Sequence, residues 1–107
     1  MEDKLTALYV MVRLEELKPE DGKSFEEPVA RQQEECMRFL REKADIQPEE
    51  PVEVYRNLGQ LLMDVERQRI KRVVVYNLDR LGSSPEERDG ILFELKAAGV
   101  ELLTVTG

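Results

Sequence analysis

The segment Lys71–Val105, KRVVVYNLDRLGSSPEERDGILFELKAAGVELLTV, decides the fold, because it holds a strand, a charged turn, a helix and a second strand in one run. Five of the six residues from 73 to 78 are apolar or aromatic, which is typical of a strand buried on both faces. Asp79 and Arg80 follow this strand, at the carboxyl edge where open α/β sheets bind ligands. The segment therefore predicts a βαβ unit with two charged side chains at that edge.

Both ends of the helix in this unit are marked in the sequence. Ser84 is expected to be the N-cap, with Pro85 at the first helical position and Glu87 at the third, the pattern of a capping box. Gly99 is expected to end the helix before a strand at residues 100–105.

Four further elements are expected upstream, and they also alternate between strand and helix. Apolar runs predict strands at residues 5–13 and 51–55, and helical periodicity predicts helices at about 28–44 and 57–68. The side chains expected on the buried faces are Val29, Gln33, Cys36, Phe39 and Leu40, then Val52 and Val54, then Leu58, Leu61, Leu62 and Val65. The acidic stretch at residues 14–27 is expected to be a long loop.

The element order βαβαβαβ predicts an α/β fold. It indicates a three-layer α/β/α sandwich with a mainly parallel central sheet of four to five strands, because right-handed crossovers place helices on both faces. The 107 residues fit a single domain, residues 1–107, and none of them forms a separate DNA-binding domain.

The composition excludes several kinds of site. The chain has no histidine and a single cysteine, Cys36, so histidine catalysis, the usual zinc sites and an internal disulfide are excluded, and no metal or cofactor is expected. Cys36 is interpreted as a core residue. The amino terminus is acidic and its apolar run is short, so neither a signal peptide nor a membrane span is expected. We therefore expect a cytoplasmic location.

The formal net charge of −7 disfavours direct binding to DNA, because binding a duplex requires cations that neutralise phosphates. The basic cluster at residues 67–72 is interpreted as the polar end of the second helix, where cations favour the helix dipole.

The tripeptide Asp79–Leu81, with the helix and strand after it, resembles the N-terminal catalytic domain of the resolvase/invertase family of serine site-specific recombinases, which carries D-R-L-x-R here. Ser83 stands at the place of the second arginine, and Gln32, Cys36 and Arg56 extend the resemblance upstream. The resemblance implies a resolvase-like fold with strand order 2-1-3-4 and a further antiparallel fifth strand. It also implies DNA strand transfer through a phosphoserine link, with DNA as partner and with dimers and tetramers.

The family's nucleophile is a serine in a Y-x-R-V-S motif after the first strand, surrounded by arginines that stabilise the charge developing on the phosphate. Alignment on Tyr9 places Met11 at the arginine and Arg13 at the serine. A shift of two residues keeps Arg13 as the arginine and places Glu15 at the serine. Neither register supplies a hydroxyl, and neither a guanidinium nor a carboxylate suits attack on a phosphodiester.

The residual candidate site residues are Arg13, Arg56, Asp79, Arg80 and Ser83. Arg80 could hold phosphate with Asp79 as its orienting partner, but without the serine we favour a pair that stabilises the turn. Arg56 could contact phosphate or pair with nearby acids. Ser83, at the amino end of the last helix, is the weak nucleophile candidate, since no base is visible to activate it.

Three functions stay open from the sequence. The first is a degenerate, catalytically inactive recombinase domain that acts through protein contacts in DNA recombination or a mobile-element system. It would reach DNA through an attached domain or a partner protein, and its homo-oligomeric state is open. The second is an active recombinase domain with an atypical nucleophile. The third is a receiver-like or flavodoxin-like interaction module, which shares the parallel sheet and its functional edge.

Overall fold

The computed structural model describes residues 4–12, 26–42 and 50–106. In chain order the elements are β1 (Leu5–Tyr9), α1 (Glu26–Glu42), β2 (Val52–Tyr55), α2 (Leu58–Glu66), β3 (Ile70–Val75), the 3₁₀ helix η3 (Leu78–Leu81), α3 (Pro85–Ala97) and β4 (Glu101–Thr104). The four strands form one sheet in the order β2-β1-β3-β4, and every neighbouring pair is parallel. The predicted α/β class and strand order 2-1-3-4 are confirmed.

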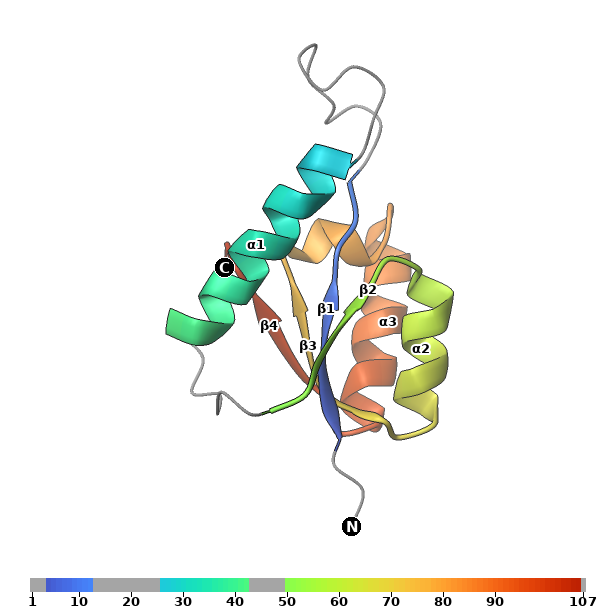
Figure 1. The fold of residues 1–107 in the computed structure, drawn as a ribbon. Helices are drawn as coiled ribbons and strands as arrows, with labels where there is room; N and C mark the ends of the chain where they lie inside the picture. Colours follow the sequence, from blue (N-terminus) through green and yellow to red (C-terminus); the bar gives the residue numbers. More distant parts are fainter. Residues whose placement is uncertain (1–3, 13–25, 43–49, 107) are drawn as a thin grey trace.

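The sheet is the middle of three layers (Figure 1). Helix α1 covers one face, while α2 and α3 cover the other. Strand alternation distributes the core accordingly: Leu8 and Val74 pack in the cluster that contains Cys36 of α1, whereas Ala7 and Val73 pack in the cluster of α2 and α3. The central strands β1 and β3 are therefore buried on both sides.

Strand β3 lies three residues earlier than the expected 73–78. It pairs with β1 from Ile70 onward, and the chain leaves the sheet after Val75 to form η3. Leu78 is consequently 41% exposed on the 3₁₀ helix, where a buried strand residue was expected. The predicted strand was placed too late because the apolar run includes Tyr76 and Leu78, which lie beyond the end of β3 at Val75.

Both predicted ends of α3 are confirmed. The Ser84 hydroxyl accepts the Glu87 N–H at 3.2 Å, with Pro85 in the first turn. The Glu87 carboxylate accepts the N–H of Ser83 at 2.8 Å, so the cap extends one residue upstream. Gly99 has a φ of 73°, a left-handed conformation that favours glycine and ends the helix.

The upstream helices differ from the prediction in detail. Helix α1 begins two residues before the expected position 28, and its expected end at 44 lies outside the described residues. Gln32 is buried where Gln33 was expected, and Gln33 is half-buried. Helix α2 is capped by the Asn57 side chain and ends at Glu66, because Gln68 takes a φ of 60°.

The predicted strands at residues 5–13 and 51–55 also need correction. Strand β1 ends at Tyr9, after which the Val10 N–H still bonds the Tyr55 carbonyl at 2.9 Å, and residue 13 lies outside the described part. On β2, which lies at the edge of the sheet, Val52 is 36% exposed and Tyr55 is the buried member.

Tyr55 anchors this edge strand to α2. Its hydroxyl donates to the carboxylate of Asp64 at 2.5 Å, and Asp64 also accepts from Gln60 Nε2 at 3.3 Å. Burial raises the pKa of the Tyr55 phenol, and the hydrogen bond to Asp64 raises it further. Asp64 is 4% exposed, so the hydrogen bond from the Tyr55 hydroxyl supplies a partner that this buried carboxylate needs.

The predicted basic helix end is largely a misinterpretation, because Lys71 and Arg72 lie on β3. Arg72 donates to Glu50 at 3.0 Å and to Glu101 at 2.6 Å, and Lys71 forms an ion pair with Glu50. Burial raises the pKa of Glu50, but hydrogen bonds and charges from Lys71 and Arg72 outweigh it and lower that pKa. These cations join strands at the amino edge of the sheet.

Among the helices described, none combines the length and apolar character that a membrane span requires.

Candidate functional site

The parallel sheet brings three chain segments to one edge. Met11 follows β1, Arg56 follows β2, and η3 with Arg80 follows β3. Because β1 lies between β2 and β3, Met11 leaves the sheet between the segments that carry the two arginines. This edge is where the resemblance places the reaction centre.

Arg80 is a buried side chain at this edge, with only 7% of its surface exposed. Its Nη1 donates to the Met11 carbonyl oxygen at 3.1 Å. The guanidinium carbon lies 5.6 Å from the centre of the Tyr76 ring, within the range of a cation–π contact. Arg80 therefore connects η3 to the end of β1.

Gln32 of α1 binds the same main-chain group. Its Oε1 accepts the Met11 N–H at 3.0 Å, and its Nε2 donates to the Met11 carbonyl at 3.0 Å. We call Gln32, Arg80 and the Met11 main chain the Met11 clamp. The sequence indicated Gln32 only through the resemblance; its four-residue spacing from Cys36 is the signal that places both on one helix face.

Ser83 lies exposed just before α3 and is engaged by Glu87. Its hydroxyl donates to Glu87 Oε2 at 2.9 Å. The hydrogen bonds from the N–H and the hydroxyl of Ser83 hold the pKa of Glu87 below its usual value. Gly82 permits this geometry, because a Cβ at that position would lie 2.8 Å from the Glu87 Cβ.

The other predicted site residues have different surroundings. Asp79 is exposed, and its Oδ1 lies 3.5 Å from Nη1 of Arg88, which also donates to the Gly82 carbonyl at 3.3 Å. Arg56 is exposed, and within the described part of the chain no hydrogen bond or ion pair to it is found. Arg13 lies outside the described residues.

Cys36 lies in the core beneath α1, with no exposed surface. Burial, with a smaller effect of Glu35, raises the pKa of its thiol to about 11, against the opposing charge of Arg80. The described residues contain no group of three or more histidine, cysteine, aspartate or glutamate side chains placed to hold a metal ion.

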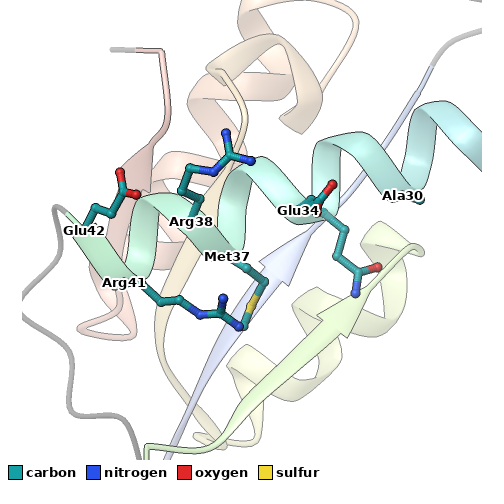
Figure 2. Close-up of a pocket in the computed structure, with 7 residues that line it drawn as sticks. Ala30, Glu34, Met37, Arg38, Arg41 and Glu42 are labelled. Atoms are coloured by element: carbon teal, nitrogen blue, oxygen red, sulfur yellow. The ribbon is translucent and has the colours of Figure 1, made fainter.

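One hollow lies on α1, and Arg80 is not among the residues that line it (Figure 2). It measures about 600 Å³, and its described lining comes from one side of this helix, including Met37, Arg38 and Arg41. Two arginines and two glutamates line it, and none of them belongs to the Met11 clamp.

Comparisons with known proteins agree with this architecture. Residues 22–107 match the family described as "Resolvase, N terminal domain", a match that begins after β1 and the segment where the nucleophile would lie. No curated protein gives a significant sequence match.

Two solved structures share the fold. The C-terminal catalytic domain of ISC1926 TnpA, an IS607-like serine recombinase, superimposes with a TM-score of 0.70 at 19% identity, over 94% of this chain and 68% of that one. The N-terminal catalytic domain of TP901-1 integrase gives 0.67 at 19% identity, over 96% and 78%. With the family match covering most of the sequence, the chain belongs to the resolvase N-terminal domain family.

Proposed function

We propose that this chain is a catalytically silent resolvase-like domain that acts through protein contacts in DNA recombination or a mobile-element system. The observation that carries the proposal is the Met11 clamp. In the register aligned on Tyr9, the position of the family's arginine is occupied by Met11, whose main chain is bound by Gln32 and Arg80.

The environment of Arg80 supports this proposal. A guanidinium that stabilises a phosphoryl transition state has to present its donors to the phosphate oxygens. Arg80 is instead 7% exposed, and one of its terminal nitrogens donates to a protein carbonyl. Its hydrogen bond to the Met11 carbonyl holds β1 and η3 together.

The described hydroxyls at the start of α3 also have structural roles. Ser84 is the N-cap, and Ser83 donates to Glu87. A carboxylate that accepts from Ser83 is the arrangement an atypical nucleophile would need, so Ser83 is the alternative for an active domain. The lowered pKa of Glu87 makes that carboxylate a weak general base, which argues against this alternative.

Membership of the resolvase family favours the recombinase scaffold over a receiver-like or flavodoxin-like module. The acidic net charge supports indirect access to DNA, through an attached domain or a partner protein. We infer a cytoplasmic protein that is able to associate with other recombinase subunits.

A covalent-adduct assay tests the proposal. The full chain, joined to a sequence-specific DNA-binding domain so that DNA is delivered to it, is incubated with end-labelled duplex carrying the target site and resolved under denaturing conditions. An active serine recombinase domain in the same fusion serves as the positive control. We expect no protein-linked DNA. A labelled adduct that disappears in Ser83→Ala would establish the alternative nucleophile, and an adduct that persists would point to another residue; either result refutes catalytic silence.

A further inference from the structure

Two hollows lie along the seam between α2 and α3. One measures about 400 Å³ and is lined in part by Val65 and Phe93; the other measures about 350 Å³ and is lined in part by Leu62 and Ile91. Glu94 lines both hollows, so they meet at that residue. We call this surface the α2–α3 groove, made of Leu58, Leu62, Val65, Ile91, Phe93 and Glu94.

The floor of the groove is apolar, and one aromatic side chain stands beside it. Phe93 is 72% exposed, more than any other large hydrophobic residue among those described. Isolated exposed apolar residues are common on protein surfaces, but this one lines a hollow together with Val65, Ala97 and Ala98. A ring in that position can close over an apolar side chain that enters the groove.

The rim of the groove is acidic. Four glutamates line the two hollows, namely Glu66, Glu86, Glu87 and Glu94, and all four are exposed. Among the described residues that line either hollow, none is lysine or arginine. The charge therefore selects for a cationic occupant, and it opposes a second copy of this chain, whose net charge is −7.

The two helices also set the size of the occupant. The 9 residues of α2 and the 13 of α3 give walls roughly 14 and 20 Å long at about 1.5 Å per residue. A third helix of about three turns fits such a seam, with apolar side chains at i, i+3 or i+4, and i+7 entering the groove.

We propose that the α2–α3 groove docks a basic amphipathic helix of a partner protein. This inference rests on the proposed function, since it names the kind of partner through which a silent domain would act. The partner helix places leucine-like side chains against Phe93 and lysine or arginine side chains against the glutamate rim.

A designed peptide tests the groove directly. The probe is a fluorescein-labelled helix of about 14 residues, roughly 20 Å long, with leucines on one face and lysines and arginines on the other. Fluorescence anisotropy with the full chain measures Kd at low and high salt. We expect saturable binding that weakens as salt screens the rim.

Two substitutions with matched controls locate the binding surface. Phe93→Ala is expected to weaken binding about tenfold, and Glu94→Lys about three- to tenfold. Met63→Ala removes another exposed apolar side chain of α2, and Glu34→Lys makes the same charge change on α1. Both controls are expected to leave Kd within about twofold, because neither residue lines the groove. Far-ultraviolet circular dichroism confirms that each variant is folded.

Several results would overturn the proposal. These are the absence of saturable binding, equal effects of groove and control substitutions, or equal affinity for an acidic peptide with the same leucines. Concentration-dependent dimerisation that Phe93→Ala abolishes would assign the groove to a second copy instead. The adduct assay separates the two proposals: a covalent DNA adduct refutes catalytic silence, whereas lost peptide binding without an adduct overturns only the groove.

Discussion

Replacement of Arg80 by methionine tests whether this guanidinium holds the fold or waits for a phosphate. The substitution removes a charged hydrogen bond to the Met11 carbonyl and a cation–π contact with Tyr76. Charged hydrogen bonds contribute about 1.5–3 kcal/mol and cation–π contacts about 0.5–1 kcal/mol. We therefore expect Arg80→Met to lower the free energy of unfolding by roughly 2–4 kcal/mol.

Urea denaturation followed by far-ultraviolet circular dichroism measures this change. A domain of this size has a total stability of about 5–15 kcal/mol, so the midpoint should move clearly, and Tm should fall by roughly 10 °C or more. Arg56→Met is the matched control, since that arginine follows a neighbouring strand but is exposed, and it should change stability by less than about 0.5 kcal/mol.

The opposite result for Arg80 would refute the clamp. If Arg80→Met were as stable as the parent chain, or more stable, the buried charge would be a cost retained for some other purpose. Replacement of a functional residue often raises stability in this way, because functional sites retain residues that are unfavourable for the fold. Arg80 would then again be a candidate phosphate-binding residue.

Three further predictions concern other parts of the chain. Ser84→Ala should lower the stability by about 1 kcal/mol in the same denaturation assay, and a change no larger than that of Ser83→Ala would contradict the assignment of the cap. Cys36 should react with a maleimide at pH 7.5 only as fast as the domain unfolds, because its thiol is buried and its pKa is about 11; fast labelling of the folded chain would disprove this. Folding lowers the pKa of Glu50, so the carboxylate stabilises the fold above its unfolded pKa, and this stabilisation is lost as pH falls through the folded pKa. Glu50→Gln should therefore flatten the acid side of the plot of unfolding free energy against pH. An unchanged slope would refute the assignment.

The sequence predicted best what local chemistry specifies. The serine–proline–glutamate start of α3 and the left-handed glycine at its end were both read correctly, because each depends on residues within one turn. The strand order followed from a family resemblance that the DRL tripeptide carried. Periodicity alone would not have distinguished that order from other right-handed parallel arrangements.

What the sequence could not supply were contacts between distant segments. The end of β3 was misplaced because Leu78 and Tyr76 continue an apolar run that leaves the sheet. In the Met11 clamp, Gln32 is 21 positions and Arg80 is 69 positions from Met11 in the sequence, so no local pattern could reveal these contacts. The interpretation of Asp79 and Arg80 as a turn-stabilising pair stays a prediction.

The short contact between Tyr55 and Asp64 gives the domain a built-in optical reporter. The chain has three tyrosines and no tryptophan, so the fluorescence excited in the tyrosine absorption band comes from its phenol rings. A phenol that donates a hydrogen bond to a carboxylate loses much of its emission through excited-state proton transfer. Tyr55 keeps its hydrogen bond to Asp64 only while β2 packs against α2. Brightening of the phenol signal would then record separation of the edge strand from its helix, without any attached dye.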